Sequence, residues 1–168
     1  IAFSMSGQLQ PLYFKEVALI GEDQIGYLGA IFAIAMMLTP MPSGRLSDKY
    51  GERVPLIVGF ALLFIGFVTF LNVAGFVGFA LAWVIAGMGV GLLSPAYQSF
   101  ISKVIPQHML GTFTGLFRSS IGLISLPAPL IGTLMWDNFG PKFPFFVAAF
   151  MLLLSMPPIW FVFVLPDK

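Results

Sequence analysis

The residues of this chain that are able to do acid, base or metal chemistry are few and scattered. The 168 residues include one histidine, seven acidic residues and no cysteine. His108 and the acids do not recur at the spacing of a metal site, and we find no Ser/His/Asp arrangement or glycine-rich phosphate loop. The formal net charge of +1 gives no strong field for nucleic acid. We therefore expect no enzyme, metal site, cofactor or nucleic-acid partner.

Charge is concentrated instead in one segment, Gly44 to Arg53, which lies between two long apolar stretches. Gly44 and Gly51 allow tight turns and the close approach of neighbouring backbone. We expect Asp48 just before the start of a helix, where its carboxylate caps the helix N-terminus or pairs with an Arg or Lys across the loop. The basic residues of the segment hold it outside lipid.

The composition indicates that lipid is the solvent for the rest of the chain. Hydrophobic residues make up 58% of the sequence and charged residues only 9%, whereas a soluble domain carries about 25% charged residues. With so few charges, the chain is unable to cover itself with a polar surface. The sequence predicts an all-α polytopic membrane protein.

Six apolar stretches approach the length of about 20 residues that a transmembrane helix requires. The first is short, and we interpret it as the outer part of a helix whose beginning is missing. The expected helices span residues 1–14, 25–42, 54–73, 79–101, 112–136 and 143–165. The expected loops span residues 15–24, 43–53, 74–78, 102–111 and 137–142.

The distribution of Lys and Arg predicts the orientation, because short cytoplasmic loops carry an excess of both. One side of the predicted bundle holds Arg45, Lys49, Arg53, Lys103 and Lys168, with Arg118 just inside the next helix. The other side holds only Lys15 and Lys142. We expect a multi-pass protein of the plasma (cell inner) membrane, with the basic side and both ends of the six-helix unit in the cytoplasm.

The ten residues GRLSDKYGER, numbered 44–53, resemble the signature loop of the major facilitator superfamily. That loop reads Gly, any residue, Leu, Ala or Ser, Asp, Arg or Lys, any residue, Gly and two basic residues. Only Glu52 departs from this pattern. The resemblance implies that residues 1–168 form one six-helix half of a twelve-helix transporter. The run from Gly111 to Gly115 with Arg118 resembles the eleventh helix and favours the C-terminal half, although the well-matched loop favours the N-terminal half.

The resemblance also implies roles. In the family, the signature loop latches neighbouring helices in one conformation, a role that we carry to Gly44, Asp48, Lys49, Gly51 and Arg53. We expect Glu52 to pair with Arg45 or Lys49. If the segment is only a solvated loop, these residues serve to set the topology.

The implied function is secondary active or facilitative transport of a small solute by alternating access, as a symporter, antiporter or uniporter. Its partners would be the lipid bilayer, the other six-helix half and a small-molecule substrate. No acid lies deep in a predicted helix, so if transport is proton-coupled the titrating group is expected in the other half; otherwise the protein is a uniporter or uses another gradient. The alternative is a membrane scaffold or receptor of the same fold that does not transport.

Polar residues inside the predicted helices are candidates for a substrate cavity, because an unpaired amide in lipid is costly. We expect Gln8 to line it, with Gln10 and Tyr13 towards the outer mouth and Gln98 at the inner mouth. Interhelical hydrogen bonds or interfacial anchoring would also explain them. Arg118 either extends to the interface, binds an anion or pairs with Asp48.

Glycine and proline positions suggest close packing and kinks. Gly87 and Gly91, and likewise Gly111 and Gly115, are four residues apart, a spacing that lets helices approach closely. Pro127 and Pro129 should kink the fifth helix, which would then be a candidate gate element.

Overall fold

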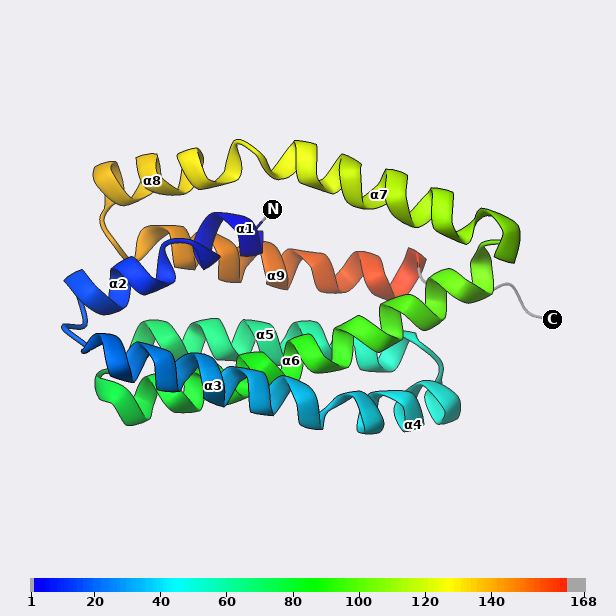
Figure 1. The fold of residues 1–168 in the computed structure, drawn as a ribbon, viewed down its shortest axis with the longest axis horizontal. Helices are drawn as coiled ribbons and strands as arrows, with labels where there is room; N and C mark the ends of the chain where they lie inside the picture. The colour runs from blue at the N-terminus through cyan, green and yellow to red at the C-terminus, as the bar shows by residue number, and fades with distance from the viewer. Residues whose placement is uncertain (1, 163–168) are drawn as a thin grey trace.

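The computed structural model describes residues 2–162, with side chains described for residues 4–159. The helices of this part run in the order α1 (Ala2–Gly7), α2 (Gln10–Glu16), α3 (Glu22–Leu38), α4 (Pro40–Tyr50), α5 (Arg53–Asn72), α6 (Gly75–Val104), η1 (Gln107–Met109), α7 (Leu110–Ser125), α8 (Ala128–Phe139) and α9 (Phe143–Val162). Joined end to end, they run antiparallel along the bundle as α1–α2, α3–α4, α5, α6, α7–α8 and α9 (Figure 1).

The all-α membrane architecture predicted from composition is confirmed. Within the described residues, four helical stretches are long and apolar enough to cross a membrane: Glu22–Tyr50, Arg53–Asn72, Gly75–Val104 and Gln107–Phe139. A shorter apolar helix covers Phe143–Ile159. The first pass is made of two short helices, because α1 ends at Gly7 and α2 begins at Gln10.

The prediction of a charged loop over residues 43–53 is wrong. Helix α4 continues the α3 pass through Thr39, and Pro40 stands in its first turn, where a missing backbone N–H costs nothing. Only Gly51 and Glu52 separate α4 from α5. Gly51 has φ +79°, in the left-handed region that favours glycine. The charged residues show where the chain leaves the apolar layer of the membrane. The helix itself continues past that point and ends at Gly51, where the backbone turns.

Other helix ends also differ from the prediction. Helix α6 runs from Gly75 to Val104 rather than over 79–101, since Gly75 (φ +75°) completes the preceding turn and the polar residues near Lys103 remain helical. The first polar loop narrows to residues 17–21. The end predicted for the sixth helix, at 163–165, lies outside the described residues.

The fifth pass begins at Leu110 rather than at 112 and is interrupted at Leu126 and Pro127. Proline lacks the backbone N–H and crowds the preceding turn, so a continuous ladder of hydrogen bonds is not maintained there. Beyond the break, α8 continues to Phe139. The result is a pass made of two helices with a change of direction between them (Figure 1).

An aromatic cluster forms the core at one end of the bundle, where α2, α5, α6 and α9 meet. The ring centroid of Tyr13 lies 5.0 Å from that of Phe70 and 5.4 Å from that of Phe145. Phe14 packs edge-on against Phe79, with centroids 5.1 Å apart. The Tyr13 side chain is only 3% exposed, so the expectation that it lines a substrate cavity is not met: it belongs to the packed core.

Glycines bring α6 into close contact with its neighbours. A Cβ atom added at Gly87 would lie 2.6 Å from the carbonyl oxygen of Phe32 in α3. One added at Gly89 would lie 2.8 Å from the carbonyl oxygen of Gly59 in α5, and one at Gly91 would collide with the Thr39 hydroxyl. Small residues at these positions therefore allow the backbones of α3, α5 and α6 to meet.

Replacement of Gly87 by Ala should destabilise the bundle, because its new methyl group meets backbone that is unable to move aside. We expect a loss of about 1–3 kcal/mol of stability, measured as a lower unfolding temperature of the detergent-solubilised protein. Gly29→Ala is the control, since no described atom lies within 4 Å of the added Cβ. Equal unfolding temperatures for the two variants would contradict the packing argument.

Candidate functional site

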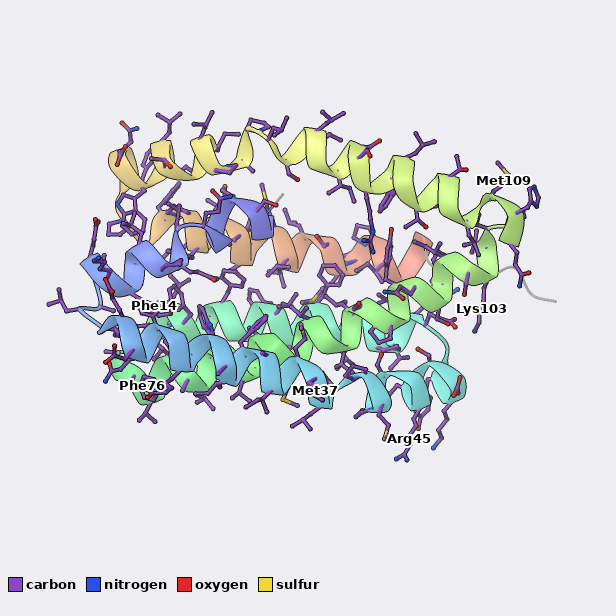
Figure 2. The ribbon with its side chains drawn as sticks, in the orientation of Figure 1. Phe14, Met37, Arg45, Phe76, Lys103 and Met109 are labelled. Carbon is purple, nitrogen blue, oxygen red and sulfur yellow. The ribbon has the colours of Figure 1, made fainter. Side chains whose placement is uncertain are left out.

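Two features of the bundle carry the candidate functional residues: its charged end and a set of polar residues along the helices. We call the charged end the part that contains the α4–α5 turn and the α6–α7 connection. Figure 2 shows Arg45, Lys103 and Met109 there, whereas Phe14 and Phe76 lie at the opposite end. Basic residues far apart in the sequence are thus brought to one end, as the predicted topology requires.

Asp48 does not lie where the sequence suggested. It is inside α4, near the C-terminal end of that helix, so it is unable to cap the N-terminus of α5, whose N-cap residue is Glu52. Asp48 is exposed, and among the described residues its carboxylate makes no hydrogen bond or ion pair. The Lys49 ammonium lies 5.0 Å from the centroid of the Tyr50 ring.

The two glycines of the signature segment, and its last basic residue, Arg53, lie in different surroundings from one another. Gly51 makes the turn described above. Gly44 lies within α4 and would have open space around an added Cβ among the described residues, so the expected close approach does not occur there. Arg53 is half-buried at the first position of α5.

Glu52 is the buried acid of the charged end. Its side chain is 2% exposed, and its Oε1 accepts hydrogen bonds from the Ser99 hydroxyl (3.1 Å) and from the Lys103 ammonium. The prediction that Glu52 pairs with Arg45 or Lys49 is therefore wrong. Arg45 and Lys49 lie on exposed positions of α4, whereas Ser99 and Lys103 are one turn apart near the end of α6.

The charge of Glu52 is maintained by its partners. Burial alone would raise the pKa of the Glu52 carboxyl, but the hydrogen bonds from Lys103, the backbone and Ser99, together with the Lys103 charge, hold the pKa below its ordinary value. A lowered folded pKa contributes stability that is fully present above the unfolded pKa. That contribution is lost as the pH falls through the folded pKa.

A second contact ties the signature segment to α6. The hydroxyl of Ser43, which is fully buried, donates a hydrogen bond to the Leu92 carbonyl oxygen at 2.8 Å. Ser47, one turn further along α4, is also buried. The serines of α4 therefore face α6, while Asp48 and Lys49 face outwards.

The polar residues of the first pass do not share one site. Gln8 is exposed at the break between α1 and α2. Gln10 lines a cavity of about 110 Å³. The other residues that line this cavity are apolar or aromatic, and they include Phe32, Phe67 and Trp83. This cavity lies between α2, α3, α5 and α6.

Gln98 lines a larger cavity, of about 430 Å³, between α6 and α7 near the charged end. Ser94 and Tyr97 share its α6 wall, and Thr114, Phe117 and Arg118 contribute from α7. Ser94, Thr114 and Phe117 were not predicted as cavity residues, whereas anion binding was one of the three roles considered for Arg118. The spacing of three and four residues on each helix could have indicated that the lining residues share a helix face. No signal in the sequence indicated that α6 and α7 enclose a cavity.

Helix α7 packs only loosely against the rest of the described chain. None of its residues is buried among the described residues. Gly111 and Gly115 have no described atom within 4 Å of an added Cβ, so their expected close packing finds no partner in this part of the chain. Pro127 is the N-cap of α8, and Pro129 lies in its first turn.

The sequence matches the family model of the Major Facilitator Superfamily over residues 1–168. It is 29% identical over 132 residues to an uncharacterized MFS-type transporter, MJ1560, of Methanocaldococcus jannaschii, which covers 79% of this chain and 34% of that protein. It is also 29% identical over 145 residues to the quinolone resistance protein NorA of Staphylococcus aureus (strain MRSA252), which covers 86% of this chain and 37% of that protein.

This chain belongs to the Major Facilitator Superfamily. It spans about a third of the length of the curated relatives described above. It is an integral membrane protein with several apolar helices, and its Methanocaldococcus jannaschii relative is named as an MFS-type transporter.

Removal of the Lys103 ammonium should expose the cost of burying Glu52. We expect Lys103→Met to destabilise the protein by about 1–3 kcal/mol at neutral pH, because a buried carboxylate loses its counter-charge. The deficit should shrink in acid, where Glu52 becomes protonated. The measurement is the unfolding temperature in detergent as a function of pH.

The double variant Glu52→Gln/Lys103→Met is the matched control for this pair. It leaves no charge in the buried position, so it should recover much of the lost stability and lose the pH dependence. A double variant as unstable as Lys103→Met at neutral pH would show that the ion pair is not the cause.

Proposed function

We propose that this chain is one six-helix half, more specifically the C-terminal half, of a secondary active or facilitative transporter that moves a small solute by alternating access. Its environment is the plasma membrane, with the charged end and both ends of the six-helix unit in the cytoplasm. The observation that carries the proposal is the signature segment itself, which is joined to α6 through Ser43 and Glu52.

The signature segment is well suited to act as a conformational latch. Its inner side is bonded to α6, so that α4, α5 and α6 move as one body at this end. Its outer side presents the exposed Asp48 carboxylate and the Lys49 ammonium, which have no ionic partner among residues 4–159. Groups of this kind are free to pair with a second body in one state and to separate from it in the other.

The second body in this proposal is the other six-helix half. Support comes from α7, which has no buried residue in the described chain and carries Gly111 and Gly115 on an exposed surface. Small residues let a helix of the other half approach closely. The break before Pro127 then gives the α7 segment freedom to tilt relative to α8, as a gate would require.

The positions of the acidic residues bear on whether transport by this protein is coupled to protons. Among the described residues, each acid lies in a turn or near a helix end, and none lies midway through a membrane-spanning stretch. A proton relay usually needs an intramembrane carboxylate. In this proposal the coupling acid belongs to the other half, or the protein is a uniporter.

A non-transporting scaffold of the same fold is the competing function. Uptake of candidate solutes into liposomes that contain the full-length transporter separates the two. We expect uptake that responds to an imposed gradient and saturates with solute. Absence of protein-dependent flux for every solute tested, with correctly inserted protein, would favour the scaffold.

The latch is tested by Asp48→Asn in the full-length transporter. We expect transport to fall about tenfold or more, equivalent to the loss of an interaction worth about 1.4 kcal/mol in one state, while membrane insertion is unchanged. Asp137→Asn is the matched control, because Asp137 is also an exposed acid, near the end of α8 at the opposite end of the bundle. Wild-type transport by Asp48→Asn would contradict the latch.

A further inference from the structure

The cavity between α6 and α7 is lined by one face of each helix. On α6 its residues recur at intervals of three and four, as in Ser94, Tyr97 and Gln98, and on α7 the same holds for Thr114, Phe117 and Arg118. This spacing places side chains on a single helical face. At about 430 Å³, the cavity is within the usual size range of small-molecule sites, about 300–1,000 Å³.

The cavity has a cationic group and no acid. Arg118 is the charged residue of its lining, and among the described residues its guanidinium makes no hydrogen bond or ion pair. Arg118 is eight residues into α7, about 12 Å along the helix from Leu110. A permanent cation at this depth is costly unless an anion or water compensates it, so the cavity favours a negatively charged ligand group.

The remaining lining suits an oxyanion attached to an apolar body. The Gln98 amide and the hydroxyls of Ser94 and Thr114 are hydrogen-bond donors that supplement the planar fork of the guanidinium. The rings of Tyr97 and Phe117 bridge the two helices, with centroids 6.0 Å apart and planes inclined by 31°. They offer flat apolar surface beside the polar donors.

We propose that this cavity is a substrate subsite for an amphipathic organic monoanion. Its carboxylate or sulfonate binds Arg118 with help from Gln98 and Thr114, and its apolar body packs against Tyr97 and Phe117. This assignment rests on the proposed transport function and specifies its substrate class. An anionic lipid headgroup shares the same chemistry, and the experiment below separates the two sources.

Binding of a matched pair of probes tests the proposal. The full-length transporter, in nanodiscs of phosphatidylcholine, is titrated with naphthalene-2-sulfonate and with the neutral naphthalene-2-sulfonamide. We expect Arg118→Gln to weaken sulfonate binding about tenfold or more, as the loss of a charge-assisted hydrogen bond implies, and to change sulfonamide binding by less than about twofold. Arg118→Lys should retain part of the sulfonate affinity.

Arg45→Gln is the control, since Arg45 is an exposed arginine at the same end of the bundle but outside the cavity lining. It should leave the binding of both probes unchanged. Equal losses for both probes in Arg118→Gln would indicate structural damage, and unchanged sulfonate binding would indicate another role for Arg118. Either result overturns the proposal.

The lipid source is tested by adding phosphatidylglycerol to the nanodiscs. If this anionic lipid abolishes sulfonate binding to the wild-type protein, the cavity is a headgroup site and the substrate assignment is overturned. If the protein transports other solutes but does not bind the sulfonate, the subsite proposal is overturned and the proposed transport function is retained. Arg118-dependent sulfonate binding without flux of any solute would instead count against the transport function.

Discussion

The close contact of α6 with α3 and α5 is the constraint on which the rest of the structure depends. Lipid is as apolar as the side chains, so burial of apolar surface does little to bring these helices together. Attraction comes instead from dispersion contacts, which require short distances. Gly87, Gly89 and Gly91 supply that proximity by having no side chain to keep the neighbouring backbones apart.

The charged end follows from this packing. With α6 held beside α4 and α5, its last turns carry Ser99 and Lys103 to the α4–α5 turn, where Glu52 is buried. A buried carboxylate is tolerated only with a counter-charge and hydrogen bonds. One oxygen, Oε1, has both, whereas Oε2 is buried without a hydrogen-bond partner among the described residues. The contact between α5 and α6 is thus a point where a small change in helix position changes the electrostatic energy.

The two sides of the bundle differ in how closely their helices pack. The aromatic cluster around Tyr13 and Phe70 packs α2, α5, α6 and α9 together at the end away from the charges. Helix α7 stands apart, with its connection through η1 at one end and the break before Pro127 at the other. In the transport function proposed above, this loosely held helix and the packed unit beside it would be the parts that move relative to each other.

The sequence by itself determined the environment and the family of this protein. Composition and the length of the apolar stretches are enough to predict a membrane bundle. A chain with so few charged residues is unable to present a polar surface to water, so its helices must lie in lipid. Ten residues of the signature segment were enough for the family resemblance. The mismatch at Glu52 also pointed to an altered charge network, although it did not reveal the partner.

Only the tertiary structure decided which residues meet. Local charge patterns do not tell whether Gly44 to Tyr50 is loop or helix, since a helix ends only where the backbone turns, at Gly51. Lys103 lies 51 residues from Glu52, and sequence distance says nothing about which of several lysines faces a buried acid. Tyr13 and Gln98 were both candidates for the substrate cavity, but one is in the aromatic core and the other lines a cavity. The physical reason is that these outcomes depend on helix rotation and on close packing between α6 and its neighbours, which no single segment encodes.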